Sequence, residues 1–341
     1  MIFIFSSKDD FTTNKVCDWL RYYEHQYIRL NKETQNVRIE EFDLGNDLII
    51  LNIEGYKINI KDITAVWFRR GGLSDVLSEW NDPIHIPKNL GIIQNILSHK
   101  IKNEINQLAL FIQFKIENGK NIGSYFNKGL NKLKMLDLAK NEGFKIPDTF
   151  IVSKLDELES ILSKNEVVTK AISDGLYEFT DDTAYYTYTE EINNSTLDTF
   201  SDSFTPSLLQ SKIQKKIEIR SFYLVDRFYS MAIFSQKNKK TSTDYRKYDS
   251  EIPNRMIPYE LPSNIEDMLI RIYEKVGLNT GSADIIVDEE NNFYFLEINP
   301  VGQFTMTSTP CNYYLEKEVA LELIRIKNET TKGKDPKIKK E

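Results

Sequence analysis

The segment of residues 281–300 constrains the fold of this chain more than any other part of its sequence. Two runs rich in β-branched and aromatic residues flank a short polar stretch, and this pattern predicts a β-hairpin. We place the turn between Glu290 and Asn291. With that turn, Asp284 on the first strand lies directly opposite Glu297 on the second.

Three oxygen-bearing side chains meet on one face of the predicted hairpin. Because side chains alternate along a strand, Glu297 and Asn299 share a face, which Asp284 joins from the neighbouring strand. Two carboxylates and an amide oxygen are ligands that suit Mg²⁺. The opposite face is expected in the core, with Ile285, Val287, Leu296 and Ile298. An amphipathic hairpin with a solvated acidic face explains the same pattern, so these residues alone leave both interpretations open.

Composition narrows the class of protein. The chain has 341 residues, enough for roughly two domains, and its 40% hydrophobic and 28% charged residues are typical of a globular protein. A formal net charge of −7 argues against a nucleic-acid coat, and no apolar run reaches the roughly 18 residues that a membrane span needs. The two cysteines, Cys17 and Cys311, lack metal-site spacing, so we expect a reducing cytoplasm.

Secondary-structure signals run along the whole chain and indicate an α/β (α+β) fold. A capping box from Ser153 to Asp156 is expected to begin the helix that ends at Leu162. Strands dominate from there to the hairpin, and the polar residues 329–341 are expected to form a frayed tail. Other expected elements are a strand at 2–5, a hairpin over 47–60, a strand at 64–68, and helices over 88–117, 131–143, 263–276 and 313–327.

Three further motifs accompany the acidic hairpin. Lys132 opens the helix over 131–143, Lys170 ends a strand run at 167–170, and a β-rich run covers 208–213. Together with Asp284 and Glu297-x-Asn299, they resemble the ATP-grasp superfamily of carboxylate–amine and carboxylate–alcohol ligases. An exposed helix lysine, a strand-end surface lysine and an ordinary buried strand are the alternatives that the residues alone leave open.

The superfamily resemblance implies a nucleotide site. It implies that the three oxygen ligands of the hairpin hold Mg²⁺ and that Lys132 and Lys170 contact the phosphates of ATP. It also implies that backbone groups of a hinge segment carry the adenine, the segment being Gln210, Ser211, Lys212 and Ile213.

A narrower resemblance covers residues 1 to about 325. Trp67-Phe-Arg69-Arg70 and four later segments, given below, resemble the graspetide synthetases. These are ATP-grasp peptide maturases of the grasp-with-spasm and microviridin type. The segment that continues past Asn299 to Gln303 is the feature that indicates this family within the superfamily. The later segments are Glu218-Ile-Arg220-Ser-Phe-Tyr, Ser235-Gln236, Asp244-Tyr-Arg246-Lys-Tyr248-Asp249 and Leu296-Glu-Ile-Asn-Pro-Val-Gly-Gln303-Phe304.

The family resemblance implies an ATP-grasp fold in three parts. These are an N-terminal pre-ATP-grasp α/β domain (1–122), a central small subdomain with an insert (123–205) and a C-terminal antiparallel-sheet subdomain (206–328), before the tail (329–341). It implies that ATP activates an Asp or Glu side chain of a ribosomally made precursor peptide as an acyl phosphate. A Thr or Ser hydroxyl, or a Lys amine, of the same peptide then closes an ω-ester or ω-amide macrocycle.

The implied cofactors are ATP and Mg²⁺, and the implied partner is a precursor peptide with a leader and a core. No nucleic-acid or membrane partner is expected, and the resemblance is compatible with a homodimer. Arg220 and Arg246 are expected at the γ-phosphate and the substrate carboxylate, because a guanidinium binds both bidentately. Glu218, on the same strand face as Arg220, is expected to orient that arginine or to contact the nucleophile.

Four residues are suggested for substrate binding, namely Arg69, Arg70, Asp244 and Gln303. A structural role at a strand end is the alternative for the first two, and surface salt bridging is the alternative for the Arg220–Arg246 pair.

Two features depart from the family pattern. The loop that covers the phosphates carries a single glycine, Gly175, and the usual acidic hinge residue is replaced by Ser211 or Lys212. Another ATP-grasp ligase that adds an amino acid to a peptide or protein terminus is the first alternative function. A non-catalytic nucleotide- or peptide-binding module is the second. Gln303 and the segment 244–249 favour the peptide cyclase.

Overall fold

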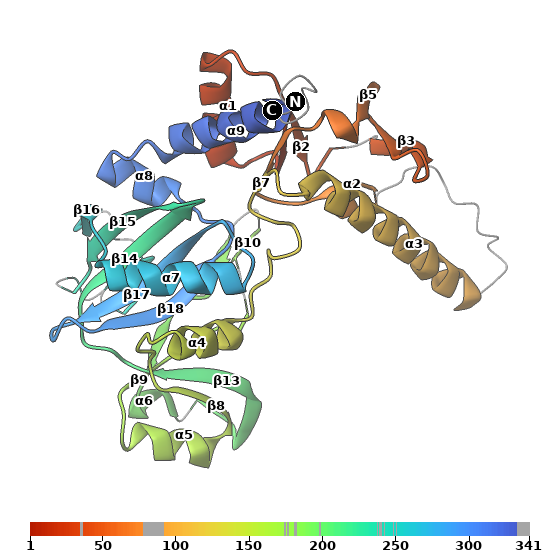
Figure 1. Ribbon diagram of the computed structural model, residues 1–341. Helices are drawn as coiled ribbons and strands as arrows, with labels where there is room; N and C mark the ends of the chain where they lie inside the picture. The colour runs from red at the N-terminus through yellow and green to blue at the C-terminus, as the bar shows by residue number, and fades with distance from the viewer. Residues whose placement is uncertain are drawn as a thin grey trace. The chain divides into compact units, whose positions relative to one another are not determined.

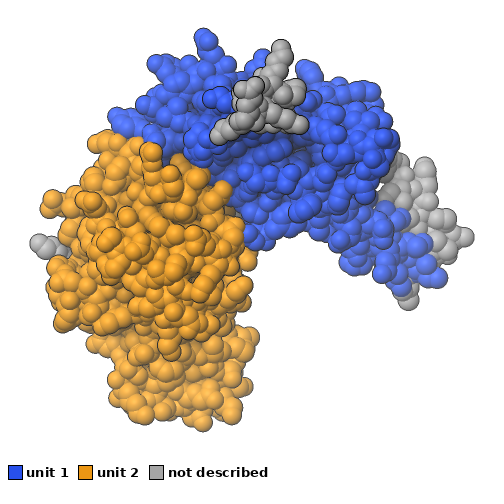
Figure 2. Space-filling view, in the orientation of Figure 1, with its two compact units in different colours: residues 1–128, 314–341 blue, residues 129–313 orange. Residues whose placement is uncertain are grey.

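The chain forms two compact units, which Figure 2 shows in two colours. Unit 1 consists of residues 1–128 and 314–341, and unit 2 of residues 129–313. The computed structural model describes residues 1–34, 37–77, 92–173, 175, 177–180, 183–197, 199–236, 238, 241, 243–247, 249 and 251–332. Three parts of the sequence predictions lie outside the described residues, namely Tyr248, residues 88–91 of the long helix and residues 333–341 of the tail.

Unit 1 contains a parallel sheet, a small antiparallel sheet and the helices that cover them (Figure 1). Its elements are β1 (Ile2–Ser6), α1 (Phe11–Tyr22), β2 (Tyr27–Asn31), β3 (Val37–Asp43), β4 (Leu48–Ile53), β5 (Tyr56–Asn59), the 3₁₀ turn η1 (Ile60–Asp62), β6 (Ala65–Phe68), α2 (Leu73–Leu77), α3 (Ile92–Glu117), β7 (Asn121–Ile122) and α9 (Leu315–Lys332).

The parallel sheet has the strand order β2-β1-β6-β7. All five residues of β1 are buried, as expected for a parallel strand covered on both faces, and this explains its unbroken run of apolar residues. Helix α9 packs against α1 and β6, so the last helix of the chain completes unit 1. The predicted hairpin over 47–60 is confirmed as β4 and β5, joined at Glu54 and Gly55, which both have positive φ angles.

Unit 2 contains two larger antiparallel sheets. Its elements are α4 (Lys132–Asn141), β8 (Thr149–Lys154), α5 (Leu155–Leu162), β9 (Val167–Lys170), β10 (Tyr177–Phe179), β11 (Ala184–Tyr186), β12 (Glu190–Ile192), α6 (Asn194–Leu197), β13 (Ser203–Ser211), β14 (Lys215–Leu224), β15 (Arg227–Phe234), β16 (Arg255–Tyr259), α7 (Ser263–Lys275), β17 (Thr280–Asp288), β18 (Phe293–Asn299) and α8 (Thr305–Cys311).

The first of these sheets has the order β12-β9-β13-β8, with α5 packed on it, and the second has the order β16-β15-β14-β17-β18. Helices α4 and α7 cover one face of the five-stranded sheet (Figure 1). That face supplies the core of unit 2 through every second residue of its central strands, including Ile219, Ala283, Ile285 and Ile298. The alternate residues of the same strands therefore face the other way, where the polar side chains gather.

The acidic hairpin has the predicted cross-strand pair but a different path between that pair and the turn. Asp284 pairs with Glu297, as predicted. The strand pairs nearest the turn place the centre of the turn at Glu290, whereas the prediction placed it between Glu290 and Asn291. A bulge at Leu296 shifts the pairing by one residue, so that Asp284 still lies opposite Glu297. As a result Phe295 is fully buried in the core, whereas Leu296 is only partly buried, so the expectation that Leu296 lies in the core is wrong.

Two local predictions are also wrong. Ser153 does not cap a helix, because it still belongs to strand β8; Lys154 is the residue before α5 and makes no side-chain capping bond. The frayed tail does not begin at residue 329, because α9 continues to Lys332. Both errors concern the end of a helix, which short sequence signals locate only to within a few residues.

Candidate active site

A row of polar side chains crosses three adjacent strands of the five-stranded sheet in unit 2. Arg220 on β14 pairs with Asp284 on β17, which pairs with Glu297 on β18. Because strand partners on one face lie side by side, the three charged groups form a continuous row on the face opposite α4 and α7. Asn299 continues the same face of β18.

Arg220 is buried and holds Asp284. Its Nη1 atom donates to both carboxylate oxygens of Asp284, at 3.0 and 3.1 Å, and lies 3.3 Å from the hydroxyl of Tyr245. Its Nη2 atom donates to the carbonyl of Gly302 at 3.2 Å. Nε of Arg220 is buried and has no hydrogen-bond partner among the described residues. The guanidinium thus fixes the position of Asp284 and leaves one donor for a further group.

Lys132 links the row to the four-stranded sheet of unit 2, which contains β9. Asn131 caps the start of α4 by accepting from Lys134 N, which places Lys132 at the first helical position. The ammonium of Lys132 donates to the carbonyl of Ala171, just after β9, at 2.8 Å, and lies 3.3 Å from Oε2 of Glu297. One lysine therefore touches the end of β9 and the acidic hairpin together.

Lys170 is the last residue of β9. Burial lowers the pKa of Lys170 to about 8, with Lys132 and Arg246 adding to the decrease and Glu297 and Asp284 opposing it. Its ammonium makes no hydrogen bond or ion pair with a residue that the structure describes. A desolvated cation of this kind is poised to gain from an anionic ligand.

The two carboxylates of the row have opposite electrostatic surroundings. Burial raises the pKa of Asp284 to about 6, and the Glu297 carboxylate adds to the increase although Arg220 opposes it. Burial also acts to raise the pKa of Glu297, but Lys170 and Lys132 outweigh it and the pKa is lowered. A cation between the two groups would relieve their repulsion, which fits the predicted Mg²⁺ site.

The donor set for a metal is small. Within the described ranges no group of three or more His, Cys, Asp or Glu side chains is placed to hold an ion. The predicted set contains only two carboxylates and the amide of Asn299. Oδ1 of Asn299 accepts from the backbone N–H groups of Val301 and Gly302, at 3.0 and 3.3 Å, so it also shapes the loop after β18. Such a set suits an ion whose other ligands are water and phosphate oxygens.

Arg246 and Asp244 form a tight pair beside this row. The Nε and Nη2 atoms of Arg246 donate to Asp244 at 2.9 and 2.5 Å, and Asp244 also accepts from the backbone N–H of Thr189 at 3.0 Å. Burial acts to raise the pKa of Asp244, but Arg246 and these hydrogen bonds hold it below its ordinary value. Asp244 is 4% exposed, whereas 40% of the Arg246 side chain is exposed. Asp244 therefore positions Arg246.

Glu218 is held by partners other than Arg220. Its Oε1 atom accepts from the ammonium of Lys215 and from the hydroxyl of Ser235, both at 2.7 Å. Burial raises the pKa of Glu218 even with this lysine present. Three residues of the site, namely Lys215, Ser235 and Tyr245, were not predicted from the sequence. Lys215 lies three positions before Glu218, and the other two lie within the family motifs, so the sequence did carry a signal for each.

The hinge segment is anchored at the end of β13. Gln210 is buried and donates through Nε2 to the hydroxyl of Thr149 at 3.0 Å. Backbone N–H groups of Ser211 and Lys212 donate to Asp148 and Glu166 carbonyls at 2.9 and 2.8 Å. The Lys212 ammonium pairs with Glu191 at 2.8 Å, and Ile213 is partly buried. These contacts fix the hinge backbone.

Three predicted site residues belong to other segments of the chain. Gln303 is exposed and has a positive φ angle of 43° in the loop after β18. Arg69 and Arg70 belong to unit 1, at the end of β6.

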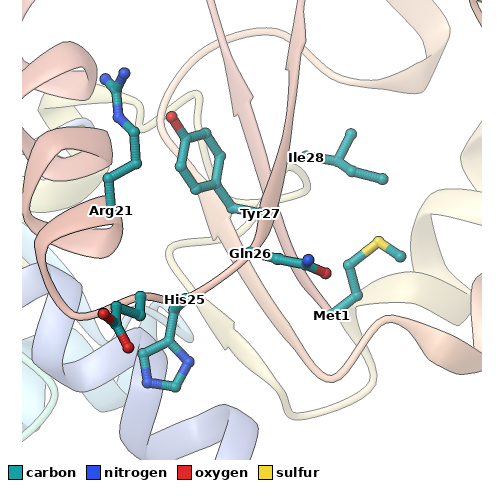
Figure 3. A pocket seen from close by; sticks show the side chains of 7 residues that line it. Met1, Arg21, His25, Gln26, Tyr27 and Ile28 are labelled. Atoms are coloured by element: carbon teal, nitrogen blue, oxygen red, sulfur yellow. The ribbon is translucent and has the colours of Figure 1, made fainter.

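Two surface hollows lie in unit 1. One, of about 450 Å³, is lined by Met1, Arg21, His25 and Tyr27 among others (Figure 3). Its polar groups have protein partners: the amino group of Met1 donates to Thr64 and to a carbonyl, and His25 lies 3.1 Å from the Lys327 ammonium. The other hollow is lined mainly by apolar residues of β3 and α3. Neither contains a residue predicted for the site.

No helix in the described part of the chain has the length and hydrophobicity needed to cross a bilayer.

A scan of protein-family models and a search of curated proteins gave no match. Among solved structures, a RiPP-associated ATP-grasp ligase of Chryseobacterium gregarium, in complex with ADP and a leader and core peptide, is 25% identical, with a TM-score of 0.74 over 96% of each chain. The chain has the ATP-grasp fold.

Two further solved structures agree with this result. The macrocyclase MdnC of Microcystis aeruginosa MRC, bound with precursor peptide MdnA, has a TM-score of 0.70 and 21% identity over 95% of this chain and 100% of its own. The ATP-grasp ligase PsnB, complexed with minimal precursor, Mg and ADP, has a TM-score of 0.69 and 15% identity over 96% and 98%. The predicted resemblance to peptide-maturing ATP-grasp ligases is thereby confirmed, as is the predicted fold class.

Proposed function

We propose that this chain is an ATP-dependent ligase that joins side chains within a ribosomally made precursor peptide. A peptide Asp or Glu carboxylate takes the γ-phosphoryl group of ATP, which gives an acyl phosphate and ADP. A Thr or Ser hydroxyl or a Lys amine of the same peptide then attacks the acyl carbon, and phosphate leaves with formation of an ω-ester or ω-amide.

The proposal depends on a cluster of charged side chains in unit 2, formed by Lys132, Lys170, Asp284 and Glu297. Arg246 pairs with Asp244, and Lys215 pairs with Glu218. Among the described residues, the cations Lys132, Lys170 and Arg220 are then left with two carboxylates, Asp284 and Glu297. The excess positive charge suits a polyphosphate. This cluster lies on a fold that matches, over 96% of the chain, an ATP-grasp ligase solved with ADP and a leader and core peptide.

Each residue of the nucleotide site has a proposed role. Asp284, Glu297 and Asn299 would hold Mg²⁺, which when bound offsets the charge of the phosphates. Lys132 and Lys170 hold the phosphate oxygens. The backbone of residues 210–213 holds the adenine, in agreement with its anchoring at both flanks.

The two arginines have different proposed roles. Arg220 keeps Asp284 in place, and its buried Nε is the donor it has left for a ligand. Arg246 presents an exposed guanidinium whose orientation Asp244 fixes, so it is the better candidate for the γ-phosphate and the peptide carboxylate. Glu218 completes the same strand face and is a candidate contact for the incoming nucleophile. Gln303 is a candidate contact for the peptide.

The proposal is tested by intact mass. Short Thr- and Asp/Glu- or Lys-rich peptides encoded beside the gene are incubated with the protein, ATP and Mg²⁺. We expect loss of one water per link, with no added residue, and hydroxylamine lability then separates ester from amide. A gain of one amino-acid residue would support terminal ligation, and bound ATP with unchanged mass across all these peptides would support a binding module; either would contradict the proposal.

A matched pair of variants tests the site. Glu297→Gln should abolish turnover while the fold stays intact, because the carboxylate that faces both Asp284 and Lys132 is lost. Glu290→Gln makes the same change in the exposed turn of the same hairpin and should leave turnover unchanged. Normal turnover by Glu297→Gln would remove Glu297 from the metal site.

The partner and location are part of the proposal. The precursor peptide is the proposed partner, without nucleic acid or membrane, in the cytoplasm, where Cys17 and Cys311, both buried and unpaired, stay reduced. A homodimer stays a prediction that light scattering tests.

A further inference from the structure

The strand order of unit 1 points to a second place where a ligand can bind. β1 connects through α1 to β2 on one side, while β6 lies on the other side of β1. All pairs in this sheet are parallel, so the carboxyl ends of β1 and β6 lie at the same edge. In open parallel sheets, ligands bind outside the carboxyl ends at the point where the strand order reverses.

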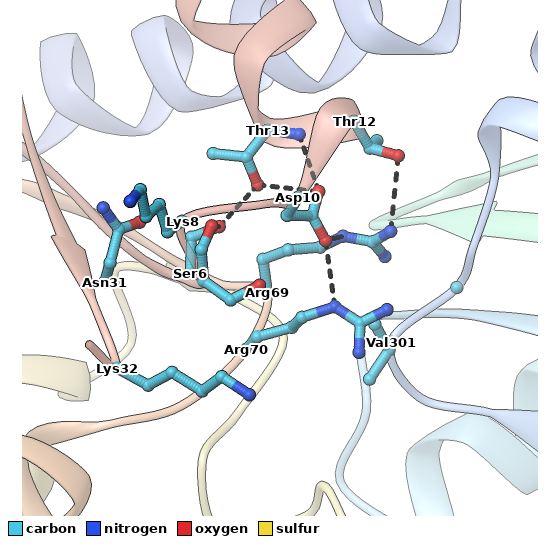
Figure 4. Close-up of polar contacts among 12 residues, drawn as sticks. Ser6, Lys8, Asp10, Thr12, Thr13, Asn31, Lys32, Arg69, Arg70 and Val301 are labelled. Carbon is cyan, nitrogen blue, oxygen red and sulfur yellow. Dashed lines mark hydrogen bonds and ion pairs between the residues drawn. The ribbon is translucent and has the colours of Figure 1, made fainter. Parts of the chain in front are cut away.

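A buried carboxylate organises this edge. Oδ2 of Asp10 accepts from Nε of Arg69 at 3.2 Å and from Nε of Arg70 at 2.9 Å, while its Oδ1 caps α1 by accepting from Thr13 N at 2.8 Å (Figure 4). Burial acts to raise the pKa of Asp10, but Arg69 and the hydrogen bonds outweigh it, so the pKa is lowered. Asp10 therefore stays ionised and fixes both guanidinium groups.

Arg69 and Arg70 differ in how many of their guanidinium N–H groups are available to a ligand. The Arg69 side chain is 3% exposed and also contacts Thr12, which makes it structural. The Arg70 side chain is 43% exposed, and its two Nη atoms make no hydrogen bond or ion pair with any residue that the structure describes. Lys32 directly follows β2, extends its ammonium toward Arg70 (Figure 4), and lies 3.8 Å from Oε1 of Glu33.

The backbone around Arg70 is rigid. The N–H groups of Arg69 and Arg70 donate to the carbonyl of Phe5 at 3.0 and 3.1 Å. Gly71 follows with a φ angle of +69°, and a Cβ atom on Gly72 would collide with the ring of Tyr125. The free end of Arg70 is thus held in place before any ligand binds, which lowers the entropy lost on binding.

We propose that Arg70 binds an acidic side chain of the precursor peptide through its two Nη atoms, at a site within unit 1. This inference rests on the proposed function. The two Nη donors match the two oxygens of a carboxylate. Asp10 offsets one of the two arginines, and Glu33 offsets Lys32. One net positive charge remains, and this suits a monoanionic carboxylate better than a polyphosphate.

The test is a cycle of protein and peptide changes. A peptide that the wild-type protein cyclises is labelled, and its affinity is measured by fluorescence polarisation without ATP. Each Asp or Glu of the peptide is then replaced in turn by Asn or Gln. We expect one acid whose replacement weakens binding to the wild type about tenfold but hardly affects binding to Arg70→Gln. Arg70→Lys should keep only part of the coupling, because the charge remains and the paired donors are lost.

Controls separate this outcome from loss of fold and from the proposed function. Arg21→Gln removes another exposed guanidinium of unit 1, and it should bind every peptide as the wild type does. Arg70→Gln should keep its thermal midpoint and its affinity for ADP, because Arg69 still holds Asp10. If the wild type cyclises the peptide but Arg70→Gln responds to every acid replacement as the wild type does, the Arg70 site is overturned and the proposed function stands. If no peptide is cyclised, the proposed function fails first.

Discussion

Lys170 makes the affinity for nucleotide depend on pH in a range where few groups titrate. In the protein without nucleotide its pKa is about 8, lowered mainly by burial. Bound phosphates would favour the charged form and raise the pKa again. The protonated fraction of Lys170 falls from about nine tenths at pH 7 to about one tenth at pH 9, so the apparent affinity for ADP should fall about tenfold.

Titration calorimetry with ADP and Mg²⁺ at pH 7, 8 and 9 measures this change. The phosphate groups of ADP are already ionised there, since their last pKa is near 6, and Asp284, with a pKa of about 6, is ionised as well. Lys170→Arg keeps its charge at every pH and should give a nearly flat profile. Lys170→Met should bind weakly at all three values. An affinity that stays constant in the wild type, or the same slope in Lys170→Arg, would refute the reasoning.

The same pKa has the opposite effect on the stability of the free protein. The folded state binds the Lys170 proton less tightly than the unfolded state, whose pKa is the ordinary 10.5. Between about pH 8 and 10.5 the unfolded state therefore holds more protons, and this group makes the free energy of unfolding rise with pH. Nucleotide binding and intrinsic stability should thus respond to alkaline pH in opposite directions.

Three further predictions concern packing and positioning. Phe295→Ala should lower the free energy of unfolding by about 3–5 kcal/mol and Leu296→Ala by less than about 1.5 kcal/mol in urea titrations, and the reverse order would contradict the bulged register. Gly302→Ala should cost about 1–3 kcal/mol in the same assay, because its φ angle is +85° and a Cβ would lie 2.9 Å from an aromatic carbon of β14; an unchanged midpoint would argue against this loop conformation. Asp244→Asn should lower kcat for peptide cyclisation about tenfold and leave ADP affinity unchanged, since Arg246 loses its charged partner; unchanged kcat would show that Arg246 needs no such support.

Nothing in the residues themselves shows that Asp244 is buried. Its segment, 244–249, is part of the predicted site, and the sequence predicts a substrate-binding role for this aspartate. The structure instead fills its oxygens with Arg246 and with the backbone of Thr189, which is 55 positions away. A partner so distant in sequence leaves no local pattern, so the change from substrate contact to positioning residue required the folded chain.

The sequence by itself determined the features that depend on neighbouring residues. Alternation and turn residues predict the hairpins over 47–60 and 281–300, and the predicted pairing of Asp284 with Glu297 is confirmed. Tertiary structure decided what depends on distant partners: the bulge that exchanges Leu296 for Phe295 in the core, and the contact of Lys132 with Glu297. It also decided that α9 belongs to unit 1. The reason is physical, because local preferences amount to tenths of a kcal/mol per residue whereas burial of one large side chain contributes about 1.5–3 kcal/mol.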